Sequence, residues 1–99
     1  MAHAPKLSDL EIASILTSLS DWKVAEGKLH KEYRFADFVH AFSFMTAAAL
    51  RIERMNHHPE WFNVYSTVRV DLTTHDSGGI SQKDVDLARV LDELAAKLQ

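Results

Sequence analysis

The stretch FVHAFSFMTAAALRIERMNHHPEWFNVYSTVRVDL, residues 38–72, contains two different periods of apolar residues in succession. Its first half spaces them along one stripe of an α-helix, formed by Phe38, Phe42, Met45, Ala49 and Ile52. Its second half alternates apolar and polar residues, as a strand with one buried face does. Pro59 stands between the halves and biases the residue before it away from helical geometry. We therefore predict a long helix that ends before His58, with strands after it.

The alternating segment, residues 61–75, is predicted to form two short strands that separate near Ser66, although one long strand fits the same alternation. The residues of one parity are expected to face the core: Phe62, Val64, Val68, Val70 and Leu72. Polar residues and Tyr65 occupy the opposite parity.

A hairpin is predicted upstream of the long helix, in residues 22–35. Apolar residues alternate with polar ones on either side of Glu26 and Gly27, where a tight turn would accept glycine at positive φ. The alternating residues are Trp22 and Val24 before the turn, and Leu29, Tyr33 and Phe35 after it, with Lys31 as an exception.

Capping boxes mark two further helices. Ser8 and Glu11 have the spacing of a capping box before the apolar repeat of residues 9–19, and Ser81 and Asp84 have it before the final helix. The loop DSGGIS, residues 76–81, precedes that final helix, because adjacent glycines disfavour regular structure.

The predicted order is α-β-β-α-β-β-α, which indicates an α+β fold: a four-stranded antiparallel sheet with three helices packed on one face. A chain of 99 residues, 46% hydrophobic and 25% charged, fits a single domain spanning residues 1–99. In so small a domain, oligomerisation is a common way to cover the free sheet face and edges, so a homo-oligomer is expected.

The composition excludes several classes of function. The formal net charge of −3 gives no basis for nucleic-acid binding, and the absence of cysteine excludes disulfides and thiolate metal sites. Neither a secretory signal nor a membrane-spanning stretch is recognisable. We expect a soluble, cytoplasmic protein.

Two adjacent histidines, His57 and His58, stand at the exit of the long predicted helix. If the helix extends that far, Glu53 lies one turn before His57 and can contact it. A carboxylate beside an imidazole orients the ring, which suits proton transfer. However, cationic histidines also favour a helix C-terminus by about 0.3–1 kcal/mol. Local sequence alone therefore leaves a functional and a purely capping interpretation equally weighted.

For the remaining candidates, the residues alone favour or readily allow a structural interpretation. His75 ends the last predicted strand beside a glycine loop, where clefts are common, yet a lone histidine there is more often structural. Asp84 is explained by its capping box, and Trp61 and Tyr65 suit a core or an interface. The other histidines are expected to be solvated or structural: His3, His30 and His40.

A metal site is weakly indicated. Glu53, His57, His58 and His75 are ligand types that zinc accepts, but the sequence has no His-x-His or His-x-x-x-His pair. We expect no metal and no cofactor, with a metal-dependent hydrolase or metal carrier as a minor alternative.

Taken together, these residues resemble the pattern of the pterin-4a-carbinolamine dehydratase family, also called dimerisation cofactor of a homeodomain transcription factor. The resemblance covers nearly the whole chain and meets every spacing of the family pattern, which reads here Glu53, His57, His58, Pro59, Tyr65, His75 and Asp84. The texts NHHPEWFNVY and LTTH are also typical of the family. The loop after His75 falls in the family's variable spacer.

The resemblance implies a hydro-lyase that dehydrates 4a-hydroxytetrahydrobiopterin to quinonoid dihydrobiopterin and water, in the recycling of tetrahydrobiopterin. It implies that His57 and His75 transfer protons, that His58 binds and orients the pterin, and that Glu53 orients His57 or binds the ring. Substrate contacts are implied for Pro59, Thr74, Asp76 and Ser77, and supporting roles for Trp61, Tyr65 and Asp84.

The resemblance leaves a second function open. Some family members bind the dimerisation helices of a transcription factor through their own helical face. A protein-binding regulatory module is therefore the alternative, and a protein partner at a helical face is expected beside the pterin and a dimer or tetramer of the chain itself.

Overall fold

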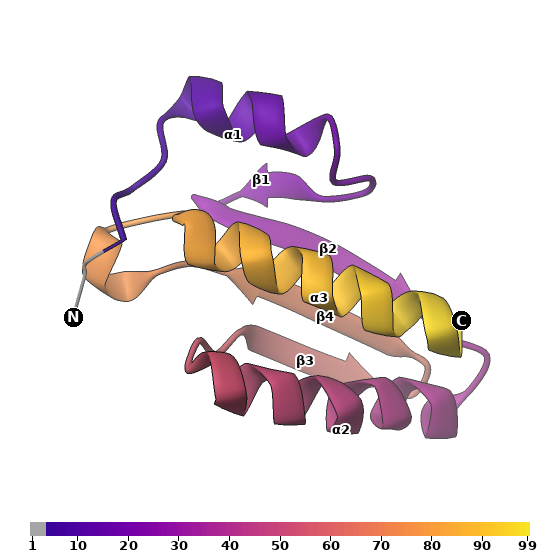
Figure 1. The fold of residues 1–99 in the computed structure, drawn as a ribbon. Helices are drawn as coiled ribbons and strands as arrows, with labels where there is room; N and C mark the ends of the chain where they lie inside the picture. Colours follow the sequence, from indigo (N-terminus) through magenta and orange to yellow (C-terminus); the bar gives the residue numbers. More distant parts are fainter. Residues whose placement is uncertain (1–3) are drawn as a thin grey trace.

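The computed structural model describes residues 4–99, and His3 lies outside them. Along the chain it forms α1 (Asp9–Leu16), β1 (Lys23–Ala25), β2 (Lys28–Arg34), α2 (Phe38–Met55), β3 (Glu60–Val64), β4 (Thr67–Leu72), the 3₁₀ helix η1 (His75–Ser77) and α3 (Gln82–Leu98) (Figure 1). The predicted order and the α+β class are confirmed. The first helix ends earlier than predicted, and the short η1 turn occupies part of the predicted loop.

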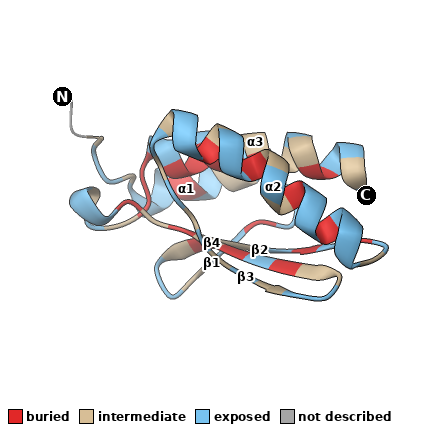
Figure 2. Ribbon diagram, turned by 90° about the horizontal axis from the view of Figure 1, so that it is seen from below, coloured by how far each residue is buried: buried red, intermediate tan, exposed pale blue. Residues whose placement is uncertain are grey.

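The four strands form one antiparallel sheet in the order β1-β2-β4-β3. All three helices lie on the same side of this sheet, and the buried residues gather where the helices meet it (Figure 2). Leu29, Val68, Val70 and Leu72 are buried on the inner face of the central strands. Among residues 4–99, no helix has the length and apolar character that crossing a membrane requires.

The α2 helix buries a different stripe from the predicted one. The prediction named Phe38, Phe42, Met45, Ala49 and Ile52, but the fully buried residues are Ala41, Phe44, Ala48 and Ile52. The helix is apolar on two faces, so periodicity alone does not decide which one packs inward. Tertiary packing decides which face is buried. The centroid of the Phe44 ring lies 5.0 Å from that of Tyr33 and 5.1 Å from that of Phe35, both on the sheet side.

The inward parity of β3 is also opposite to the prediction. Phe62 and Val64 are exposed, and Trp61 is the residue that packs against the core. A two-residue turn joins β3 to β4, so Val64 pairs with Thr67. Pairing residue i with residue i+3 reverses the parity between the two strands. The predicted break near Ser66 was right, but the alternation cannot be counted through it.

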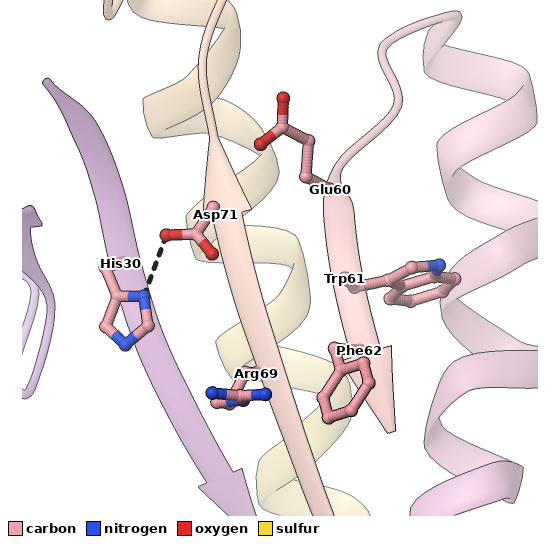
Figure 3. Close-up of a pocket in the computed structure, with 6 residues that line it drawn as sticks. All are labelled: His30, Glu60, Trp61, Phe62, Arg69 and Asp71. Atoms are coloured by element: carbon pink, nitrogen blue, oxygen red, sulfur yellow. Dashed lines mark hydrogen bonds and ion pairs between the residues drawn. The ribbon is translucent and has the colours of Figure 1, made fainter. Parts of the chain in front are cut away.

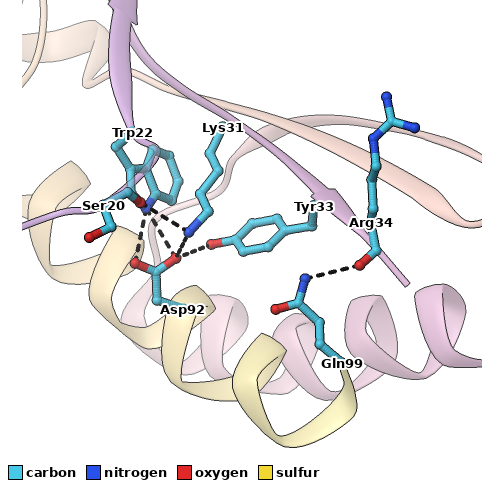
Figure 4. A network of polar contacts seen from close by, with 7 residues as sticks. All are labelled: Ser20, Trp22, Lys31, Tyr33, Arg34, Asp92 and Gln99. Carbon is cyan, nitrogen blue, oxygen red and sulfur yellow. Dashed lines mark hydrogen bonds and ion pairs between the residues drawn. The ribbon is translucent and has the colours of Figure 1, made fainter. Parts of the chain in front are cut away.

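Lys31, the exception in the predicted alternation of β2, faces inward because α3 supplies an acid there. Its Nζ lies 2.8 Å from Oδ1 of Asp92 (Figure 4). The same carboxylate accepts hydrogen bonds from Tyr33 Oη at 2.6 Å and from Trp22 Nε1 at 3.1 Å. Burial, followed by the contact with Asp92, raises the pKa of the Tyr33 hydroxyl far above its usual range. This network joins α3 to the sheet.

Replacing Asp92 with alanine should lower the free energy of unfolding by about 2–4 kcal/mol, because two buried donors, Trp22 Nε1 and Tyr33 Oη, lose their acceptor. The exposed Glu93 on the same helix provides the control, since Glu93→Ala should change stability by less than about 0.5 kcal/mol. Urea denaturation measures both. Equal effects of the two substitutions would show that the network does not stabilise the fold.

Candidate functional site

A cleft of about 570 Å³ lies at the end of the sheet where the chain leaves α2 and β4. Two segments line it, residues 55–58 and residues 73–77, together with Ala4 and Lys83. The cleft therefore brings together His57, His58 and His75, as well as Thr74, Asp76 and Ser77. These are six of the residues that the sequence singled out.

The end of α2 determines how the two histidines point. Asn56 caps the helix in the left-handed region, at φ 53°, a conformation that asparagine tolerates better than most residues. Its N–H and that of His57 return to carbonyls of the last helical turn. The turn separates the adjacent rings, so that the His57 side chain is only 12% exposed whereas that of His58 is 57% exposed.

The predicted contact between Glu53 and His57 is not formed. Glu53 Oε1 instead lies 3.0 Å from Nε2 of His58, and Nε2 of His57 lies 2.6 Å from Oδ1 of Asp84. The prediction required helical geometry through position 57, but α2 ends at Met55 and the left-handed Asn56 redirects the chain.

Asp84 is a fully buried polar residue of the site, with no solvent exposure. One carboxylate oxygen takes the His57 contact, and the other accepts hydrogen bonds from Thr74 Oγ1 at 2.8 Å and from the Ser81 N–H at 2.9 Å. The Thr74 and Ser81 hydroxyls lie 2.5 Å apart. The predicted capping box is therefore present, and the capping carboxylate also holds a histidine of the cleft.

This arrangement dictates the tautomer of a neutral His57. A carboxylate acceptor requires Nε2 to carry the proton, which leaves Nδ1 as the basic nitrogen. An imidazole held in one orientation at a cleft, with one basic nitrogen, can accept a proton and return it. The geometry thus suits general acid–base chemistry.

His75 approaches the cleft from the other segment. It is the first residue of η1 and is exposed, as is Asp76 beside it. Thr74 is buried, and its hydroxyl is already engaged by Asp84, while the Ser77 hydroxyl donates to the carbonyl of Ala4. In this segment the His75 and Asp76 side chains are thus exposed at the cleft, whereas the Thr74 and Ser77 side chains hold the segment in place.

Two of the predicted supporting residues lie outside the cleft. Tyr65 is exposed in the β3–β4 turn, at φ 51°. Trp61 points toward α2 and borders a separate groove of about 330 Å³ over the sheet (Figure 3). In that groove His30 Nδ1 lies 2.8 Å from Oδ1 of Asp71 on the neighbouring strand, and the Arg69 guanidinium lies over the Phe62 ring.

Several cleft residues were missed by sequence reasoning. Met55, Asn56, Thr73, Lys83 and the N-terminal Ala4 all line it. Lys83 could have been found, because it directly precedes Asp84 at the start of a helix. No local sequence pattern predicts Ala4, which lies at the cleft because of tertiary contacts.

Among the residues that the structure describes, no three His, Asp or Glu side chains come close enough together to hold a metal ion.

Comparison with known proteins places this chain in one family. The model of the family described as pterin 4 alpha carbinolamine dehydratase matches residues 5–94. A protein of Solibacter usitatus, provisionally named a pterin-4-alpha-carbinolamine dehydratase, is 65% identical over 91 residues, which cover 92% of this chain and 96% of that protein.

Two solved structures resemble this chain. A protein of Brucella melitensis, described as a transcriptional coactivator/pterin dehydratase, is 38% identical with a TM-score of 0.87, over 91% of this chain and 98% of that one. A pterin dehydratase-like protein described as a RuBisCO assembly factor of the alpha-carboxysome is 21% identical with a TM-score of 0.63, over 75% of this chain and 86% of that one. The latter shares the fold.

The tautomer of His57 is directly measurable. In ligand-free protein at a pH where the ring is neutral, ¹⁵N chemical shifts should show the Nε2–H form, since Asp84 accepts that proton. The substitution Asp84→Asn should abolish this preference, while exposed His40 should be unaffected by it. A predominantly Nδ1–H ring in the wild type would contradict the geometry.

Proposed function

The chain belongs to the pterin-4a-carbinolamine dehydratase family, and from this premise we propose that it dehydrates 4a-hydroxytetrahydrobiopterin to quinonoid dihydrobiopterin in the cytoplasm. The observation that carries the proposal is the His57 ring, held by the buried Asp84 at the side of a cleft that His75 also lines. Such a protein would recycle tetrahydrobiopterin after its use by aromatic amino-acid hydroxylases.

The reaction requires only proton transfers from the protein. The bond between C4a and its hydroxyl oxygen breaks, and the hydroxyl takes up a proton and leaves as water. The N5–H proton is removed, and its electron pair forms the C4a=N5 bond of the quinonoid product. No electrons are gained or lost overall, so one proton donor and one proton acceptor at the cleft are sufficient.

We assign these two tasks to His57 and His75. Nδ1 of His57 is free to exchange a proton because Nε2 is committed to Asp84. His75 is exposed on the other segment of the cleft, where it can reach a bound ring from a different direction. General acid–base catalysis of this kind contributes about 10²–10⁴-fold per group.

The other predicted site residues, in or beside the cleft, take binding and supporting roles in this proposal. Glu53 holds the exposed ring of His58, which would orient the pterin, and Pro59 keeps the chain extended after it. The exposed Asp76 carboxylate offers an acceptor for N–H groups of the substrate. Thr74 contributes through its hydrogen bond to Asp84.

Formation of the quinonoid product from synthetic carbinolamine, followed by absorbance, tests the proposal. The wild type should accelerate the dehydration, and His57→Ala and His75→Ala should each lower kcat by about 10²–10⁴-fold. His40→Gln, at the far end of α2, should leave kcat unchanged. The proposal is falsified if the wild type gives no acceleration over the uncatalysed reaction.

We also propose a protein-binding role for the outer face of α2, because the structure leaves large apolar side chains exposed there. Phe42 is 52% exposed and Leu50 is 73% exposed, and the rings of Phe38 and Phe42 lie in contact, tilted by 34° with their centroids 5.5 Å apart. An apolar surface of this kind marks contact with another protein. Its occupant would be another copy of the chain, in a dimer or tetramer, or the helix of a regulatory partner.

Light scattering tests this second role. The wild type should be a homo-oligomer, and Phe42→Glu should shift it toward smaller species because a carboxylate cannot be buried unpaired in an apolar contact. Ser14→Glu, at an exposed position on α1 outside this face, introduces the same charge as a control and should leave the size of the oligomer unchanged. A monomeric wild type with no affinity for a partner helix would rule this role out.

A further inference from the structure

The turn that carries His75 has little support of its own. The η1 helix is three residues long, contains no buried residue and lacks a side-chain hydrogen bond at its N-cap Thr74. Short 3₁₀ turns have poor hydrogen-bond geometry. Two backbone hydrogen bonds between Thr74 and Gly79 close the base of the loop. Within the turn, backbone hydrogen bonds run only from the Ser77 and Gly78 N–H groups to Thr74 and His75, so packing contributes little to holding its tip.

An N-terminal arm, residues 4–7, contacts the tip of this turn. The Ser77 hydroxyl donates a hydrogen bond to the carbonyl oxygen of Ala4, 73 residues away in the sequence. Ala4 is half-buried and lines the cleft. The arm therefore reaches the tip of the loop on one side and borders the cleft on the other.

The arm is itself fixed in place at its other end. The Leu7 N–H donates to the Ile80 carbonyl at 2.8 Å, and Lys6 pairs with Ser81 in an antiparallel bridge. The aliphatic stem of Lys6 lies so close to Gly79 that a Cβ there would come within 2.9 Å of Lys6 Cε. A glycine at this position allows the two segments to approach.

These contacts place the arm against both halves of the site. Ser81 donates its N–H to Asp84, which holds His57, while Ser77 ends the turn that begins with His75. The two histidines come from segments far apart in the sequence, so their separation depends on how the η1 turn sits relative to α3. The arm contacts the chain on both sides of that junction.

We infer that the N-terminal arm is a positioning element of the catalytic cleft, and that Ser77 is a positioning residue that fixes His75 through the Ala4 carbonyl. This inference rests on the proposed function for its catalytic consequence, and on the contacts alone for its structural one. With the hydrogen bond removed, the tip of the η1 turn would move more freely, and His75 would spend less time in a productive position.

The test compares Ser77→Ala, which removes the hydroxyl, with Ser77→Thr, which keeps it. Hydrogen exchange in ligand-free protein reports the turn through the Gly78 amide, which is bonded to the His75 carbonyl, and the fixed end of the arm through the Leu7 amide. Carbinolamine dehydration reports catalysis. Ser14→Ala, an exposed position on α1, controls for loss of a serine.

We expect Ser77→Ala to speed exchange at Gly78 by about three- to tenfold, as loss of one hydrogen bond does, with Leu7 unchanged. We expect kcat to fall by a similar factor with little change in KM, and Ser77→Thr to restore both. Because no substrate is present in the exchange experiment, a role of Ser77 limited to binding the pterin predicts unchanged exchange.

Unchanged exchange at Gly78 in Ser77→Ala would overturn the inference, as would faster exchange with unaltered kcat. A wild type without dehydratase activity would instead overturn the proposed function, and the exchange result would still decide whether the arm holds the turn.

Discussion

The buried carboxylate of Asp84 holds the cleft and the start of α3 together. It accepts from His57 at the exit of α2, from Thr74 at the end of β4 and from the N–H of Ser81 at the start of α3. Three elements thus meet at one side chain that has no contact with water. An acid buried in this way is tolerated only when its oxygens are fully hydrogen-bonded. The same hydrogen bonds to Asp84 are therefore required both for the fold and for the position of His57 in the cleft.

This shared requirement explains the division of labour in the cleft. Residues that brace the structure use up their polar atoms on one another, as Thr74 and Ser81 do. Residues that face the cleft keep polar atoms available, as His75 and Asp76 do. His57 belongs to both groups, because one ring nitrogen is committed to Asp84 and the other is not. A second carboxylate, Asp92, holds the middle of the same helix to the sheet, away from the cleft.

Local features of the fold could be predicted from the sequence because their causes are local. The capping box at Ser81, the helix end before Pro59 and the order of elements all follow from spacings of a few residues. The contact of Asp84 with His57 could not be found in this way. His57 lies 27 residues away and comes within reach only because the left-handed Asn56 redirects the chain after α2. The family pattern identified Asp84 as a site residue, but not its partner.

The errors arise where short-range patterns are insufficient. The parity of β3 depends on the length of a turn, which reverses the face that an alternating pattern assigns. The buried face of α2 depends on where Phe44 meets the sheet, because the helix offers two apolar faces. The contact of Ala4 with Ser77 joins residues 73 positions apart in the sequence, so no short-range pattern encodes it. For α2 and for Ala4 a tertiary contact decides what short-range patterns leave open, whereas for β3 the deciding feature is the length of the turn.

In the proposed mechanism Asp84 acts on the reaction through His57 alone. A double-mutant cycle in single-turnover dehydration tests it most directly, with rates normalised to the folded fraction of each variant. If the two residues act as one unit, Asp84→Asn combined with His57→Ala should be about as slow as His57→Ala by itself. Losses that multiply, so that the double variant is slower by the product of both effects, would contradict the account.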